Sequence, residues 1–325
     1  MTSPAPHVFT LTGNLLAERT LVFETWTPGR TQRAVAASFQ AGGKGVNVAK
    51  MLARLGVPAT ALVFSGGAPG AECEAWLAAR ALPHRAFASL APTRTGTVVR
   101  TVAGTAPETT FLGPDAAPDA AALAACAAFL DAQPDGRVLA LCGSFPGWSG
   151  PDFEPLRAAL LRWLARGVLV ADTYGPPLVW AAAHPLALIK INADELRSLA
   201  APEAAHSASP APPAPRAPAA TSTLVASPPG PTRRWVVSDG PRRVVVWDNA
   251  LAAEVTPPAV AEISATGSGD VLLACLLQAL FIHRRPLVDA VRYALPYASA
   301  NAAHPGIAEF PEPPGAEKLP PLPPS

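Results

Sequence analysis

Residues 265–281 read ATGSGDVLLACLLQALF and place two glycines and a serine directly before Asp270 and a long apolar stretch. In one interpretation, Asp270 caps or charges the first turn of a buried helix, where the helix dipole favours an acid. In the other, the backbone N–H groups of Gly267, Ser268 and Gly269 stay open for an anion, and the Asp270 carboxylate acts as a base beside them. This stretch alone leaves both interpretations open.

The composition favours a small-molecule partner. The chain has 325 residues, half of them hydrophobic, and can bury a large core as one big α/β domain or as two smaller ones. Its net charge is +1 without a run of like charges, which predicts no nucleic-acid surface and no basic membrane patch. The longest apolar run, residues 271–282, is too short to cross a bilayer.

The N-terminus and the cysteines predict a cytoplasmic protein. No basic segment followed by an apolar one opens the chain, so we expect no secretory signal. The four cysteines lack CxxC or metal-type spacing and are expected to be reduced core thiols; they are Cys73, Cys126, Cys142 and Cys275.

Two segments are rich in proline. Residues 201–233 form a Pro/Ala-rich stretch, and residues 311–325 form a proline-rich tail. Such composition cannot build a packed core and favours extended conformations. We expect the first to be a disordered surface insertion and the second to be a loose tail. Either could instead dock as a proline-rich ligand, but a solvated spacer is favoured.

The remaining sequence alternates between buried strands and helices, which predicts a three-layer α/β/α fold with a mostly parallel central sheet. Two stretches without helical period, within about 15–40 and 93–112, are expected to form a small separate sheet. The predicted strands are 59–64, 138–142, 167–171, 186–191 and 235–238, and the predicted helices are 46–55, 120–130, 153–165 and 271–282.

Two further segments carry polar residues at helix starts. Residues 41–56, AGGKGVNVAKMLARLG, combine a glycine-rich turn with Lys44 and Asn47, which can donate to hydroxyls or phosphate. A plain tight turn explains the glycines equally well. In IKINADEL, residues 189–196, Asn192 and Glu195 are spaced as an ordinary helix cap, yet their oxygens also suit Mg²⁺ held largely through water.

Together, GGKGVNVAKMLARLG, NADE and TGSGD resemble, in order and spacing, the PfkB/ribokinase family of carbohydrate kinases. The resemblance runs from about Thr10 to Phe310, so residues 1–310 are interpreted as one kinase domain around the insertion. GVNVA, TRT at 93–95 and CGSFPG at 142–147 resemble the branch of 1-phosphofructokinase and tagatose-6-phosphate kinase.

The resemblance implies a ribokinase-like fold whose small β-sheet closes as a lid over a sugar, and a homodimer that can form through that lid. It implies ATP-dependent phosphorylation of a sugar or sugar phosphate, most closely a ketohexose phosphate, with Mg²⁺. Asp270 is the expected base, and Gly267, Ser268 and Gly269 are expected to stabilise the transferred phosphoryl group. Asn192 and Glu195 are the expected metal ligands; Lys190, Asn192, Ser238, Gly240 and Thr266 are expected at the nucleotide, and Glu18, Gly43, Lys44, Asn47 and Arg94 at the sugar.

Several positions depart from the family pattern. Residues 14–18 read NLLAE where the branch has NPAID, so Glu18 stands for an aspartate that binds sugar hydroxyls. Gly96, in TRTG, stands where a polar residue is common in the family, and the family motif matched by CGSFPG has one more proline. The second glycine of the nucleotide loop is missing from SDGPRR, and the insertion replaces a segment that is normally helical. Two alternatives stay open: a ribokinase- or nucleoside-type kinase for an unphosphorylated acceptor, and a catalytically degenerate homologue that only binds a sugar phosphate.

Overall fold

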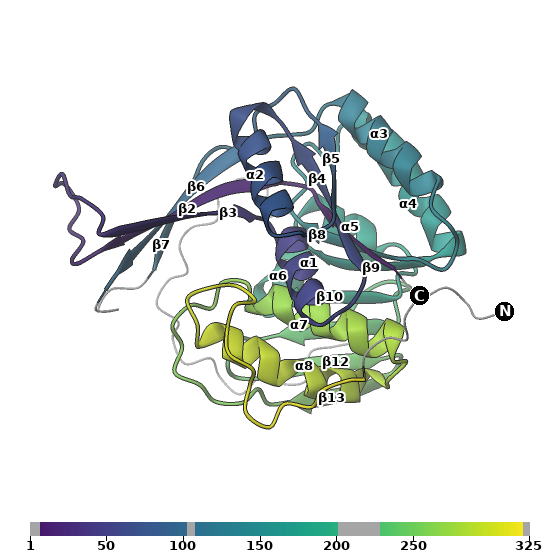
Figure 1. Cartoon of the computed structure of the whole chain (residues 1–325). Helices are drawn as coiled ribbons and strands as arrows, with labels where there is room; N and C mark the ends of the chain where they lie inside the picture. Colours follow the sequence, from purple (N-terminus) through teal and green to yellow (C-terminus); the bar gives the residue numbers. More distant parts are fainter. Residues whose placement is uncertain (1–6, 103–107, 201–227, 321–325) are drawn as a thin grey trace.

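The structure is a computed structural model that describes residues 7–102, 108–200 and 228–320 (Figure 1). Most of the predicted insertion, residues 201–227, lies outside these ranges. Within them, one sheet has nine strands in the order β13-β12-β11-β10-β9-β8-β1-β4-β5. All run in the same direction except β12, which pairs antiparallel with β11 and with the edge strand β13. Its strands are β1 Val8–Thr12, β4 Ala59–Ser65, β5 His84–Ala88, β8 Val138–Gly143, β9 Val168–Thr173, β10 Leu188–Asn192, β11 Arg234–Ser238, β12 Val244–Asp248 and β13 Leu251–Val255.

Helices cover both faces of this sheet (Figure 1). Successive strand residues point to opposite faces, so Val8 packs in the cluster with α1, α7 and α8, whereas Phe9 packs with α3 and α4. The predicted three-layer fold is therefore confirmed. The helices are α1 Lys44–Arg54, α2 Gly67–Ala79, α3 Ala120–Asp131, α4 Glu154–Arg166, α5 Pro176–Ala182, α6 Ala193–Ala200, α7 Ser268–Leu277 and α8 Leu287–Ala302, with a 3₁₀ turn at Pro151–Phe153.

A second, smaller sheet projects from the main domain, as expected for the two stretches without helical period (Figure 1). Its four described strands are ordered β3-β2-β6-β7, and β2 and β6 are its parallel pair. We call this sheet the lid sheet. Its strands are β2 Leu16–Phe23, β3 Ala36–Gly42, β6 Arg94–Thr101 and β7 Thr109–Leu112.

Two element boundaries differ from the prediction for identifiable reasons. The helix predicted at 271–282 begins earlier, because Gly267 adopts a left-handed conformation that starts α7, and its last part is the π-helical turn Gln278–Ile282. The strand predicted from residue 186 begins at Leu188. The Leu186 N–H instead donates to the Thr232 hydroxyl, which fixes the turn that precedes the strand.

The described part of the proline-rich tail is not loose. Glu312 forms an ion pair with Arg54, and Glu317 pairs with Arg285. The Tyr297 hydroxyl donates to the Glu317 carbonyl at 3.0 Å. As far as residue 320, the chain therefore packs against α1 and α8.

The four cysteines are free and buried, as expected of reduced core thiols. The cytoplasmic location inferred from them stays a prediction. Across the described ranges, no helix has both the length and the apolar character needed to span a bilayer.

Candidate functional site

A cleft of about 680 Å³ lies between the lid sheet and the carboxyl ends of the central strands. In an open α/β sheet, ligands bind outside these strand ends. The predicted site residues other than Glu195 all line this cleft: Glu18, Gly43, Lys44, Asn47, Arg94, Lys190, Asn192, Ser238, Gly240, Thr266, Gly267, Ser268, Gly269 and Asp270.

The glycine-rich turn 266–269 presents the start of α7 to the cleft. Gly267 caps the helix at φ 78°, and a Cβ atom there would lie 2.5 Å from Ile307 Cγ2. The positive φ of Gly267 favours glycine, whereas a Cβ atom on Gly269 would lie 2.7 Å from Lys190 Nζ and would displace that ammonium group. Ser268 N–H donates to Ala265 O at 3.2 Å, so one of the three N–H groups predicted to be open has an internal acceptor.

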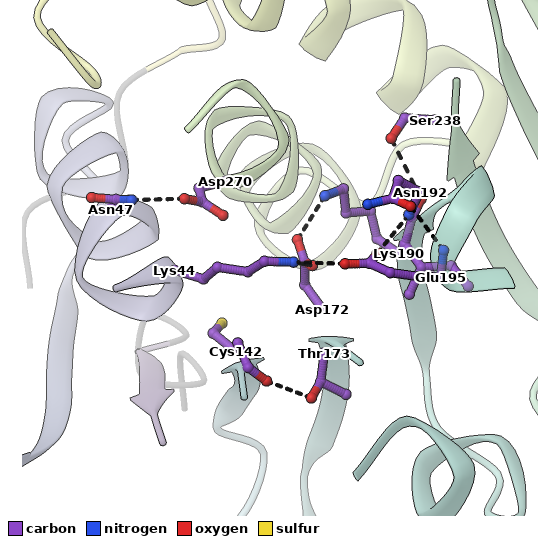
Figure 2. Close-up of polar contacts among 12 residues, drawn as sticks. Lys44, Asn47, Cys142, Asp172, Thr173, Lys190, Asn192, Glu195, Ser238 and Asp270 are labelled. Carbon is purple, nitrogen blue, oxygen red and sulfur yellow. Dashed lines mark hydrogen bonds and ion pairs between the residues drawn. The ribbon is translucent and has the colours of Figure 1, made fainter. Parts of the chain in front are cut away.

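Asp270 follows this turn and is buried, with 5% of its surface exposed. Its Oδ2 atom accepts a hydrogen bond of 2.7 Å from Asn47 Nδ2 on α1 (Figure 2). Burial and then the neighbouring Asp172 carboxylate raise the pKa of Asp270 to about 6, against the opposite effects of Lys44, Asn47 and Lys190. A carboxylate with this pKa is suited to accept a proton near neutral pH.

Asp172, at the end of β9, lies between Lys44 and Lys190, two lysines that line the cleft (Figure 2). Its oxygens are 2.7 Å from Lys44 Nζ and 2.7 Å from Lys190 Nζ, and its side chain is fully buried. Burial alone would raise the pKa of Asp172, but Lys190 and Lys44 outweigh it and hold that pKa below its usual value. Burial disfavours the Lys44 ammonium, yet Asp172, Glu195 and Asp270 together raise the pKa of Lys44.

The sequence prediction missed Asp172. A usable signal was present, because an acid directly follows the apolar strand VLVA, at the end of a parallel strand where ligands gather. The ion pairs with Lys44 and Lys190 join residues distant in sequence, and only the fold brings them together. Lys44 contacts the carboxylates of Asp172 and Glu195, and its expected role at the sugar stays a prediction.

Asn192 and Glu195 form a reciprocal helix cap at the start of α6. Asn192 N–H donates to Glu195 Oε2 at 2.7 Å, and Glu195 N–H donates to Asn192 Oδ1 at 2.9 Å. Glu195 Oε1 lies 3.2 Å from Lys44 Nζ. The described ranges contain no group of three or more His, Cys, Asp or Glu side chains that could hold a metal by itself. The two residues therefore act as a cap in this structure, and their predicted role at Mg²⁺ stays a proposal.

Residues at and after the end of β11 also line the cleft. Ser238 and Gly240 line it at the end of β11, where Gly240 has φ 55° in the turn to β12. Apolar residues from nearby segments also line the cleft; they are Val244, Pro257, Pro258, Val260 and Leu295.

The lid sheet supplies the other end of the cleft. Glu18 is 8% exposed and accepts a hydrogen bond from Gln40 on the neighbouring strand. Arg94 Nη1 donates to Asp115 Oδ1 at 2.9 Å, and the buried Nε of Arg94 has no hydrogen-bond partner among the described residues. Asn14 Nδ2 also donates to Asp115 Oδ1, at 2.8 Å. At this end of the cleft, Glu18 can therefore accept hydrogen bonds from hydroxyl groups, and Arg94 can donate hydrogen bonds to an anion.

Comparisons with known proteins agree on one family. Residues 16–313 match the model described as pfkB family carbohydrate kinase. The chain is similar to ATP-dependent 6-phosphofructokinase isozyme 2 of Escherichia coli (strain K12), with 28% identity over 303 residues that cover 92% of this chain and 94% of the relative. It is also similar to 1-phosphofructokinase of Rhodobacter capsulatus, with 30% identity over 276 residues that cover 84% and 83% of the two chains.

Solved structures give the same fold. Phosphofructokinase-2 of Escherichia coli in complex with substrates and products matches with a TM-score of 0.76 and 25% identity, over 94% of this chain and 95% of that chain. Ribokinase of Thermotoga maritima matches with a TM-score of 0.64 and 16% identity, over 94% and 96% of the two chains. The prediction of a ribokinase-like fold is therefore confirmed.

Proposed function

Because the chain belongs to the pfkB family of carbohydrate kinases, we propose that it transfers the γ-phosphoryl group of ATP to a hydroxyl of a sugar phosphate, in the first place a ketohexose phosphate. The observation that carries this proposal is the position of Asp270, a buried carboxylate with a pKa of about 6 at the start of α7 and beside the glycine-rich turn. A base and an anion-binding helix start in one cleft are what in-line phosphoryl transfer requires.

In the proposed reaction, Asp270 takes the proton of the acceptor hydroxyl while the oxygen of that hydroxyl attacks the γ-phosphorus of ATP. The bond from the γ-phosphorus to the β,γ-bridging oxygen breaks, and ADP leaves. Asn47 holds the Asp270 carboxylate through Oδ2. The start of α7 stabilises the negative charge of the transferred phosphoryl group, since the first N–H groups of a helix have no partner within it. Lys44 and Lys190 can donate hydrogen bonds in the cleft, where Asp172 fixes both ammonium groups.

The donor set fits a magnesium ion that enters with the nucleotide. Magnesium is usually held by one or two carboxylates together with water and substrate phosphates. The oxygens of Asn192 and Glu195 already accept hydrogen bonds from N–H and ammonium groups, so they would contact Mg²⁺ through water and not directly. When bound, Mg²⁺ would neutralise charge on the ATP phosphates.

The Arg94–Asp115 ion pair favours a second candidate, a kinase for an unphosphorylated sugar. The Asp115 carboxylate beside Arg94 offsets part of the positive charge that would attract a substrate phosphate.

An assay with sugar phosphates, free sugars and nucleosides as acceptors for the phosphoryl group of ATP distinguishes the two candidate functions. For a sugar-phosphate kinase, Arg94→Ala should raise KM for the acceptor strongly, and Asp115→Asn should lower it. Transfer to free sugars, with KM values that are the same in both variants as in the natural chain, would favour the second candidate. The absence of transfer to any acceptor would favour the non-catalytic homologue.

We further propose that the protein forms a homodimer through the lid sheet. Three large apolar side chains are exposed on or beside its edge strands: Val35, Phe111 and Leu112. Light scattering after size exclusion tests this. A monomeric mass for the natural chain, or a dimer that persists in Phe111→Lys combined with Leu112→Lys, would contradict the role of the lid.

A further inference from the structure

Asn301, in the last turn of α8, is fully buried and joins three segments by hydrogen bonds. Its Nδ2 atom donates to the Thr266 carbonyl oxygen at 3.0 Å and to Ser268 Oγ at 3.2 Å. Its Oδ1 atom accepts from Ala308 N–H at 2.9 Å. The side-chain amide is thus matched to two acceptors on the glycine-rich turn and to one donor beyond α8.

The adjacent residue holds the chain that leads into the same turn. The Ala302 carbonyl oxygen accepts from Ile263 N–H at 2.8 Å and from Ser264 N–H at 3.0 Å. Residues 263–268 are therefore bound to the end of α8 at both their beginning and their end.

The segment after α8 fits against the glycine-rich turn. Ile307 occupies the space next to Gly267, where a Cβ atom would lie 2.5 Å from Ile307 Cγ2. The following residue, Ala308, is buried with φ 56°, in the left-handed region that disfavours residues with a Cβ atom. A left-handed conformation of such a residue persists where the surrounding structure fixes it. The hydrogen bond from Ala308 N–H to Asn301 helps to fix it here.

We propose that Asn301 is a positioning residue for phosphoryl transfer, a role that rests on the proposed function. It fixes the orientation of residues 266–269, and with them the N–H groups at the start of α7 and the backbone of Asp270. A neutral amide suits this position because it donates twice without adding charge beside an anion site. Asn301 lies outside the residues that line the cleft, so it acts through the turn and not on the substrate.

The test compares two shape-matched changes on one helix. Asn301→Leu keeps the approximate shape of the side chain and removes its three hydrogen bonds. Tyr293→Phe, also in α8 and buried, removes the bond of 2.6 Å to Gln278 Oε1 and lies outside the cleft lining. For the natural chain and each variant, kcat, both KM values and the melting temperature are measured with ATP and the best acceptor from the screen. Asn301→Ala is measured alongside as the smaller replacement.

We expect Asn301→Leu and Asn301→Ala to lower kcat by about 10²-fold, the effect of an ångström-scale misplacement, with KM for the acceptor nearly unchanged. Tyr293→Phe should lower the melting temperature and leave kcat unchanged. A folded Asn301 variant with natural kcat, an equal kcat loss in Tyr293→Phe, or failure of both Asn301 variants to fold would each overturn the assignment. Absence of transfer by the natural chain would instead count against the proposed function.

Discussion

Asn47 Nδ2 donates to Asp270 Oδ2 at 2.7 Å, and this bond joins the first turns of α1 and α7, which lie 223 residues apart in sequence. Each helix starts after a glycine-rich turn, and the two turns therefore meet at one carboxylate. The bond also opposes the effect of burial on the Asp270 pKa, so that the group is neither fully acidic nor permanently protonated.

Replacing Asp270 by Asn should abolish phosphoryl transfer while the fold is kept. The amide preserves the shape and can still accept from Asn47, but it cannot take a proton, and loss of a general base lowers turnover by about 10²- to 10⁴-fold. Steady-state kinetics with ATP, together with calorimetric binding of ADP, measure the effect. Turnover above a tenth of the natural value would remove Asp270 from the chemistry.

The difference in free energy of unfolding between Asp270→Asn and the natural protein should change with pH in a defined direction. The folded pKa of Asp270, about 6, exceeds its ordinary value of 3.8, so between these values the folded state binds the proton more tightly and the free energy of unfolding falls as pH rises. The neutral Asn avoids this loss. Denaturant unfolding of both proteins between pH 4 and pH 7 should show a stability gain of the variant that grows towards pH 6, and a constant difference would contradict the raised pKa.

The acid side of the activity profile should report the same group. Below pH 6 the Asp270 base is protonated, so kcat/KM should fall with a midpoint of about 6. Asp172→Asn removes a charge that raises this pKa, and the midpoint should then move to lower pH. The midpoint describes Asp270 together with its charged neighbours. An unmoved midpoint in a folded Asp172→Asn protein would contradict the electrostatic link.

Asp172→Asn should also destabilise the fold. Lys190 is 4% exposed at its side chain and would lose its charged partner, and breaking a buried ion pair costs about 3–5 kcal/mol. Thermal unfolding measures this loss. Arg162→Ala is the control, because it breaks an exposed pair with Asp131 that should contribute little. Equal melting temperatures for the two variants would show that the Asp172 pairs do not stabilise the domain.

Glu18 should act at the sugar and not at ATP. A buried hydroxyl contact to a charged group contributes about 1.5–3 kcal/mol, so Glu18→Ala should raise KM for the sugar by ten-fold or more, and Glu18→Asp should change preference among epimers. Arg19→Ala is the matched control on the same strand, because Arg19 points away from the cleft to an exposed pair with Glu72. Natural constants in both Glu18 variants would remove Glu18 from the sugar site.

Several features of this protein follow from the sequence alone. Local patterns specify the alternation of strands and helices, because side-chain period and glycine turns are properties of short stretches. The motifs around Lys44, Asn192 and Asp270 likewise indicate the kinase family and most residues of the cleft, since parallel strands place their carboxyl ends at one edge.

Only the tertiary structure decided how these residues are paired. Three pairings depend on which elements meet: Asp172 between Lys44 and Lys190, Asp115 on Arg94, and Asn301 on the glycine-rich turn. The raised pKa of Asp270 depends on them as well, since burial and nearby charges cannot be read from its neighbours in sequence. Local sequence encodes backbone conformation and side-chain type, whereas distances between charges arise only when the strands and helices pack.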